Sequence, residues 1–148
     1  MRGISVRNPW AWAILHGKPV ENRGRPGWPL GEYALHASKM PAKPSEAQFY
    51  ELVDEMQIVR SMAERDGIKI PEITWRKLHA MSGAIIGVMQ IVDCVRTHPS
   101  AFYVGPFGLV LQNVRRIEPV PCKGSLGPWV VPADVERVVR GRLEASQP

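Results

Sequence analysis

The segment of residues 83–95, GAIIGVMQIVDCV, constrains the fold of this chain more than any other. It is rich in β-branched residues and carries one charged side chain, Asp93. Such a run is typical of a strand that is buried on both faces of a sheet. A second long β-prone segment, residues 107–122, ends among prolines, which cannot extend a hydrogen-bonded ladder. We therefore expect a central sheet in which residues 83–95 form an interior strand.

Shorter strands are predicted near the N-terminus. Residues 3–6 favour a strand, and residues 18–23 are extended. Residues 32–38 alternate, so that Tyr33, Leu35 and Ala37 lie on one side of a half-buried strand and the residues between them on the other.

Helices are predicted between and after these strands. Asn8 can cap a short helix that starts at Pro9 and is closed by Gly17, which suits the left-handed position after a helix. Ser45 and Gln48 form a capping box for a long helix that stops at Gly67. The apolar residues that recur at helical spacing in it are Phe49, Leu52, Val53, Met56, Val59 and Met62.

Two further helices complete the expected set. Residues 71–81 can form a shorter helix, and Pro132 can start a last one. The apolar residues on one face of the last helix are Val135, Val138, Val139 and Leu143.

These elements predict an α+β fold. Its strands enclose its helices without βαβ alternation or internal repeats, which favours a small mixed or antiparallel β-barrel with helices packed around it. A length of 148 residues fits one domain with a substantial core. We expect a single domain over residues 1–148, with a helical insertion around residues 45–80.

The charge distribution favours a phosphate-bearing partner. The chain has 19 Lys and Arg and 14 Asp and Glu; two of those bases and six of those acids fall in residues 45–66, which leaves 17 bases against 8 acids elsewhere. A basic body is typical of a domain that binds nucleic acid, although a generic solubilising surface has the same composition.

Several other classes of protein are not indicated. No apolar run is long enough to span a membrane, and MRGISVRNPW lacks the pattern of an export signal, so we expect a cytoplasmic protein with no membrane partner. Cys94 and Cys122 are then expected to be free thiols. His16, His79 and His98 have no acidic or Cys neighbour at ligand spacing, so no metal site and no cofactor is predicted.

The candidate site begins with three charged residues that directly follow the first helix: Lys18, Glu21 and Arg23. In an extended chain Glu21 and Arg23 share a face and can form an ion pair, whereas Lys18 lies opposite unless the turn at Gly17 redirects it. A Glu can accept from the exocyclic amine of a base, and Arg or Lys can meet a carbonyl, a ring nitrogen or a phosphate. A purely structural ion pair is the alternative interpretation.

Aromatic residues near this cluster could stack on a base. Trp28 lies in a Gly- and Pro-rich loop just beyond Arg23 and Arg25, and it is the best stacking candidate. Trp10 and Trp12 point in different directions from one helix, so at most one of them is expected to be fully buried. We expect packing roles for Trp12, Trp75 and Trp129.

Two strands supply further candidates. His36 and Ser38 share a face and are followed by Lys39; if their strand borders the site they face it together, and otherwise His36 is a structural residue. Asn113 shares a face with Arg115 on another strand and could read a base edge. The alternative, to which the sequence gives equal weight, is that Asn113 only caps the strand.

Four segments of the chain together resemble the ASCH domain family. They are ISVRNPWAWAILHGKPVENR, GEYALHASK, GAIIGVMQIVDCV and GPFGLVLQNVRRIEPVPCKGSLGPW. The most specific elements are a start of the form S-x-x-x-P-W/Y-A, supplied here by Ser5, Pro9, Trp10 and Ala11, and the pattern G-x-K-x-x-E-x-R. In this chain that pattern is one residue shorter, since the glycine directly precedes Lys18, while Glu21 and Arg23 keep their spacing from the lysine.

The resemblance covers nearly the whole chain, apart from the acidic helix near residues 45–66. It implies a PUA-like β-barrel, a group associated with RNA and modified-base recognition. It also implies that Lys18, Glu21 and Arg23 form the floor of a cleft beside the barrel that receives a nucleotide.

The first functional hypothesis is a binding module for RNA, single-stranded DNA or a modified nucleotide. The residues expected to contact the ligand are Ser5, Asn8, Trp10, Lys18, Glu21, Arg23, Arg25, Trp28, His36, Ser38, Lys39, Asn113 and Arg115. A protein-interaction adaptor that docks through the acidic helix is ranked last.

The alternative is a hydrolase acting in the same cleft, either a ribonuclease or an amidohydrolase on a modified nucleoside such as N4-acylcytidine. Lys18 would be its base or nucleophile, and Glu21 would orient water. The acylcytidine hydrolases of the family carry a threonine three residues after the lysine, where this chain has Glu21.

Overall fold

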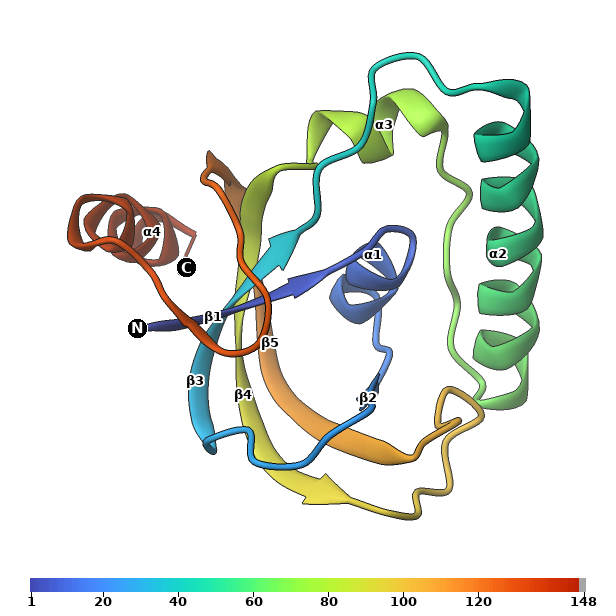
Figure 1. The fold of residues 1–148 in the computed structure, drawn as a ribbon, viewed down its shortest axis with the longest axis horizontal. Coiled ribbons are helices and arrows are strands. Elements are labelled where there is room, and N and C mark those ends of the chain that lie inside the picture. Colours follow the sequence, from blue (N-terminus) through green and yellow to red (C-terminus); the bar gives the residue numbers. More distant parts are fainter. Residues whose placement is uncertain (147–148) are drawn as a thin grey trace.

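The computed structural model of the chain describes residues 1–146, which form six strands and four helices (Figure 1). In chain order the elements are β1 (Arg2–Val6), α1 (Trp10–Leu15), β2 (Val20–Arg23), β3 (Gly31–Ala37), α2 (Glu46–Arg65), α3 (Trp75–Ala80), β4 (Ala84–Val95), β5 (Phe107–Pro121), β6 (Trp129–Val130) and α4 (Ala133–Ala145). None of these helices is both long and apolar enough to cross a membrane.

The strands form one mixed sheet in the order β2-β5-β4-β3-β1-β6. β1 and β3 run parallel, while every other pair is antiparallel. The expected α+β class is therefore confirmed, and β4 lies in the interior of the sheet as its apolar sequence predicted.

The expected closure of the sheet into a barrel is wrong. Within residues 1–146 the two edge strands, β2 and β6, do not pair, and the sheet is strongly curved but open (Figure 1). The curvature follows from three register shifts between β4 and β5, since bulges bend and twist a strand pair. The gap between β2 and β1 is bridged by a side chain, because Arg23 Nη2 donates to the carbonyl oxygen of Ser5 at 3.0 Å.

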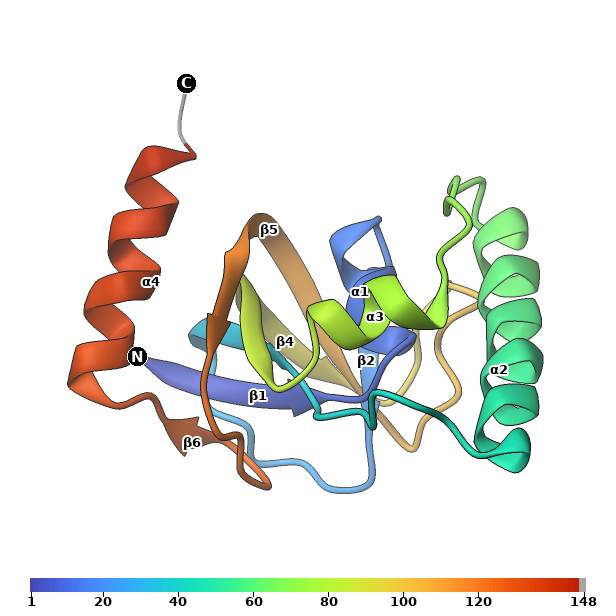
Figure 2. The ribbon, with the colours of Figure 1, turned by 90° about the horizontal axis from the view of Figure 1, so that it is seen from above.

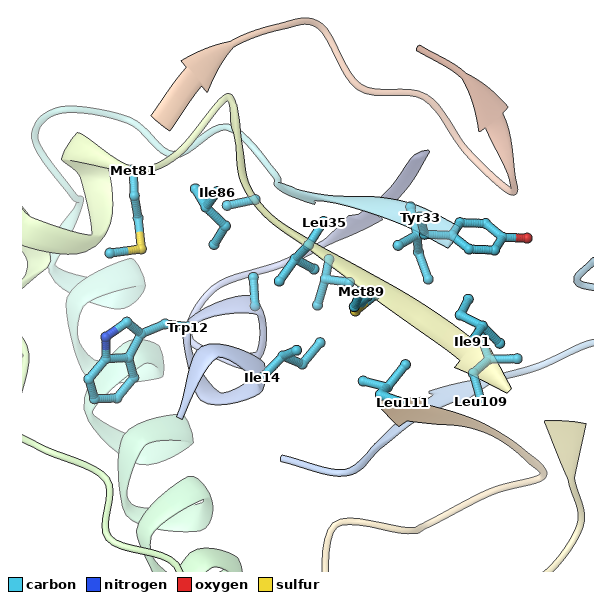
Figure 3. Close-up of a cluster of buried hydrophobic side chains, with 14 of the residues drawn as sticks. Trp12, Ile14, Tyr33, Leu35, Met81, Ile86, Met89, Ile91, Leu109 and Leu111 are labelled. Atoms are coloured by element: carbon cyan, nitrogen blue, oxygen red, sulfur yellow. The ribbon is translucent and has the colours of Figure 1, made fainter. Parts of the chain in front are cut away.

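The main core fills the concave side of the sheet. α1 lies inside this curve and packs its apolar residues against those of β3, β4 and β5 (Figure 3). The alternation in β3 is confirmed, because Tyr33 and Leu35 face this core while Ala34 faces the opposite side. There α4 covers the sheet through Val139 and Leu143 (Figure 2).

The starts of α1, α2 and α4 agree with the sequence. The helix expected from residue 71 begins only at Trp75, where Thr74 caps it. Two of the expected apolar faces also differ from the structure. In α2 the capping box is confirmed, with Ser45 Oγ accepting from the backbone N–H of Gln48 at 3.1 Å. Phe49 and Val53 were expected to be buried, yet they are 46% and 37% exposed. The reason is the position of α2 at the rim of the molecule, separated from the sheet by α1 (Figure 1), so that a narrow stripe of the helix suffices for packing.

In α4, too, fewer of the expected apolar residues are buried than the sequence predicted. Pro132 precedes α4 as expected. Val139 and Leu143 are buried against the sheet, whereas Val138, which was expected on the same face, is exposed.

Candidate functional site

Lys18, Glu21 and Arg23 converge at the end of α1. Gly17 has φ +114°, in the region that favours glycine, and it turns the chain directly after the helix. As a result Lys18 Nζ donates to Glu21 Oε1 instead of lying on the opposite face, and Arg23 Nη1 lies 2.9 Å from Glu21 Oε2. The turn at Gly17 thus selects the arrangement that alternation alone disfavours.

This charged cluster is largely shielded from solvent. Lys18 and Glu21 are 2% and 5% exposed, and the Arg23 side chain is 25% exposed. Buried charges are tolerated when they are paired and hydrogen-bonded. Since both carboxylate oxygens of Glu21 are engaged by cations, Glu21 is a structural counter-ion in this conformation, and the cluster carries one positive charge in excess.

Indole rings flank the two cations. Lys18 Nζ lies 5.3 Å from the ring centroid of Trp10, and the Arg23 guanidinium lies 5.4 Å from that of Trp28; both are cation–π distances. Trp10 is fixed from its other end, because its Nε1–H donates to Glu55 of α2 at 3.1 Å. The aromatic residues expected to stack on a base are therefore in contact with the cations of the cluster.

A cavity of about 960 Å³ opens at the carboxyl end of β3, and none of Lys18, Glu21 and Arg23 lines it. We call it the β3 cavity. It lies between residues 38–40, the end of α3 and the segment 122–126, and its charged or ionisable lining residues include Lys39, Lys123, His36 and His79. None of its lining residues within the described part of the chain is Asp or Glu. The lining therefore favours an anionic ligand.

Ser5 connects the β3 cavity with the charged cluster. Its backbone carbonyl accepts the bond from Arg23, and its side chain lines the cavity. Four of the residues predicted for the site, Ser5, His36, Ser38 and Lys39, line the β3 cavity together.

The imidazole of His36 is held at both nitrogens. Nε2 lies 2.7 Å from the backbone carbonyl oxygen of Cys122, and Nδ1 lies 3.3 Å from Ser5 Oγ. Burial lowers the pKa of His36, partly opposed by the bond to Cys122. Trp129 packs edge-on against the imidazole, with the ring centroids 5.7 Å apart.

Gly124 allows the segment 122–126 to approach this pair closely. A Cβ at residue 124 would lie 2.5 Å from Ser5 Oγ and 2.6 Å from His36 Nδ1, closer than real Cβ contacts. Only glycine fits this position without displacing the Ser5–His36 pair.

The other predicted residues lie outside the cavity. Asn8 is buried, where its Oδ1 accepts from the N–H of Trp12 at 3.1 Å and its Nδ2 donates to the carbonyl of Leu78 at 3.5 Å, so its amide joins α1 to α3. Arg25 is exposed in the loop after β2.

Asn113 and Arg115 are not brought to the cluster. Asn113 has φ +53° and is exposed on β5. Arg115 Nη2 lies 3.8 Å from Glu32 Oε2, and Glu32 also pairs with Arg140 of α4. Arg115 therefore belongs to the side of the sheet that α4 covers.

Sequence reasoning missed Lys123, Gly124 and His79 as neighbours of the site. The glycine-containing run KGSLG was the available signal for the first two, because such a run permits close approach to another backbone. His79 had no signal, since it reaches the cavity from α3, far away in sequence.

A second hollow of about 460 Å³ lies between α1, α3 and β5. Its lining mixes His16, Lys77 and Arg116 with Glu72 and Glu118. Burial and the nearby Arg116 lower the pKa of His16. With both signs of charge on its walls, this hollow does not favour an anion as the β3 cavity does.

Within residues 1–146 no group of three or more His, Cys, Asp and Glu side chains is placed to hold a metal ion. Cys94 and Cys122 are free thiols. Comparisons of the sequence with protein-family models and with curated proteins produce no match.

Proposed function

We propose that this chain is a binding module of the ASCH type for RNA or single-stranded DNA, and that the nucleic acid occupies the β3 cavity. The observation that carries the proposal is the lining of that cavity, which contains Lys39 and Lys123 and no carboxylate. We further propose that the open, curved sheet is a variant of the PUA-like barrel in which Arg23 bridges the gap between β2 and β1.

The basic groups supply an electrostatic site for the phosphate backbone. Lys39 and Lys123 line the cavity, whereas Arg23 lies outside its lining and donates to the backbone carbonyl of Ser5, which belongs to it. Lysine and arginine contacts with phosphates provide most of the sequence-independent affinity for nucleic acid. A volume of about 960 Å³ can accommodate an unpaired nucleotide, in keeping with the range of small-molecule sites.

The charged cluster has a supporting role in this proposal. Lys18 and Glu21 hold each other and leave Arg23 as the one member with substantial exposure. Arg23 is thereby oriented by Glu21 and by the ring of Trp28 before any ligand arrives. Because Arg23 in turn bonds the backbone of Ser5, the cluster preorganises one wall of the cavity, which reduces the entropic cost of binding.

The hydrolase alternative is less well supported. It required Lys18 as base or nucleophile and Glu21 to orient water. Lys18 Nζ instead donates to Glu21 in a buried pair, and the second carboxylate oxygen of Glu21 is engaged by Arg23.

Fluorescence anisotropy with labelled single-stranded RNA, single-stranded DNA and duplex DNA tests the proposal. We expect single strands to bind, with an affinity that falls as salt rises and a logarithmic slope of about 0.7 per phosphate contact. The double variant K39Q/K123Q should bind more weakly and lower the slope by about 1.4, since two such contacts are lost.

The matched control is K43Q/K69Q, which removes two exposed lysines that do not line the cavity. It should leave the slope nearly unchanged. The absence of binding to any probe at low salt, or an equal loss of slope in both double variants, would contradict the proposal.

A further inference from the structure

The hydrogen-bond pattern around His36 fixes the direction of every bond in the Ser5–His36 pair. A backbone carbonyl can only accept, so the 2.7 Å contact between His36 Nε2 and Cys122 requires the proton on Nε2. In the neutral imidazole Nδ1 is then unprotonated and must be the acceptor. The hydroxyl of Ser5, 3.3 Å away, therefore donates its proton to Nδ1.

Because Ser5 donates its hydroxyl proton to His36, its Oγ presents only lone pairs to a ligand. A serine hydroxyl has one donor and two acceptor positions. With its proton directed to His36, Ser5 can accept a hydrogen bond from a ligand in the β3 cavity but cannot donate one.

The imidazole cannot easily reverse this pattern. His36 is 3% exposed, with Trp129 edge-on to it and the backbone of Gly124 closely packed against it. Turning the ring over would break the bond to Cys122 and leave its carbonyl without this donor, which is costly for a buried group.

Among the other polar residues that line the cavity, Lys39 and Lys123 complement this acceptor, while Ser38, Ser125 and His79 can donate or accept. Lys39 and Lys123 can only donate. Ser82 is already occupied, because its hydroxyl donates to the carbonyl of His79 at 2.8 Å and accepts from the N–H of Met40 at 3.2 Å. A ligand that fits this lining presents a donor to Ser5 and acceptors to the lysines.

We propose that Ser5 makes the β3 cavity selective for nucleobases that carry an exocyclic amine, cytosine or adenine, over uracil or hypoxanthine. The amine donates to Ser5 Oγ, while carbonyl oxygens, ring nitrogens and phosphates accept from Lys39 and Lys123. In uracil and hypoxanthine a carbonyl oxygen replaces the amine and opposes the lone pairs of Ser5. This inference rests on the proposed function and moves the acceptor role expected of Glu21 to Ser5.

The test compares ligands that differ only in that group. Short single-stranded probes with all bases cytosine or all bases uracil carry equal numbers of phosphates, and AMP and IMP form a second pair. We expect the amine-bearing member of each pair to bind about tenfold more tightly, the effect of one mismatched buried hydrogen bond. S5A should bring the ratio close to one, whereas S61A, the same change on the exposed side of α2, should keep it.

A measurement on the free wild-type protein tests the hydrogen-bond pattern directly. Nitrogen-15 NMR of the His36 ring at neutral pH should find the proton on Nε2, and a proton on Nδ1 alone would overturn the inference even if S5A fails to fold.

The binding results separate the two proposals. Equal affinity for both members of each pair, a preference for uracil, or a preference that persists in S5A would refute the selectivity while leaving nucleic-acid binding in place. Failure of every probe to bind would refute the proposed function itself.

Discussion

Removing the negative charge of Glu21 should destabilise the protein severely, because it leaves Lys18 as an uncompensated buried cation. The variant E21Q keeps the size and shape of the side chain, so the effect isolates the charge. Arg23 Nη1 lies 2.9 Å from Glu21 Oε2. At an effective dielectric constant near 20, two unit charges at such a distance attract by roughly 5–6 kcal/mol.

The net cost is smaller than the attraction, because Arg23 is 25% exposed and can be solvated by water. Lys18 is only 2% exposed and cannot be solvated by water in this way. Breaking one partner of a buried pair typically costs about 3–5 kcal/mol. For a chain of this length that corresponds to a fall in melting temperature of about 6–20 °C.

Urea denaturation followed by circular dichroism provides the free energy of unfolding for this test. The double variant K18M/E21Q should recover most of the lost stability, since neither member of the pair then leaves a buried charge. E64Q, at an exposed position of α2, is the matched control and should change stability by less than about 0.5 kcal/mol. A loss below about 1 kcal/mol in E21Q, or a double variant as unstable as E21Q, would refute the buried-charge argument.

Two further changes test the walls of the β3 cavity. G124A places a Cβ 2.5 Å from Ser5 Oγ, so we expect a loss of about 1–3 kcal/mol in urea denaturation, while G24A, with no atom within 4 Å of the new Cβ, should show none of this clash cost. Because burial lowers the pKa of His36, the folded state favours the neutral ring. The resulting contribution to the free energy of unfolding is complete above the unfolded pKa of about 6.5, and it is lost as pH falls through the lowered pKa of the folded state. The free energy of unfolding should therefore decline below about pH 6.5, and H36Q should flatten that decline, whereas an unchanged profile in H36Q would show that His36 does not cause it.

The sequence determined most elements of this protein and their approximate limits, but it did not predict the short strand β6 or the start of α3 at Trp75. Period-two and helical spacing, the capping box at Ser45 and the glycine after α1 are local signals, because they depend on residues close together in the chain. They predicted the interior position of β4, the α+β class and the grouping of charges after α1.

Tertiary structure decided what these local signals cannot reach. The sheet order joins strands far apart in sequence, and the register shifts between β4 and β5 curve the sheet without closing it. Alternation placed Lys18 opposite Glu21, but the turn at Gly17 brings the two together. The exposed side of α2 was misjudged because burial depends on what a helix packs against as well as on its own pattern.

The difference between what the local sequence predicts and what the tertiary structure decides is clearest at the candidate site. His36, Ser38 and Lys39 are adjacent in the sequence and could be selected as a group. Their cavity exists because Lys123 and Gly124 return to β3 from the far end of β5. The role of Ser5 as a fixed acceptor depends on a carbonyl 86 residues away from His36, and no local pattern encodes a hydrogen bond across such a separation.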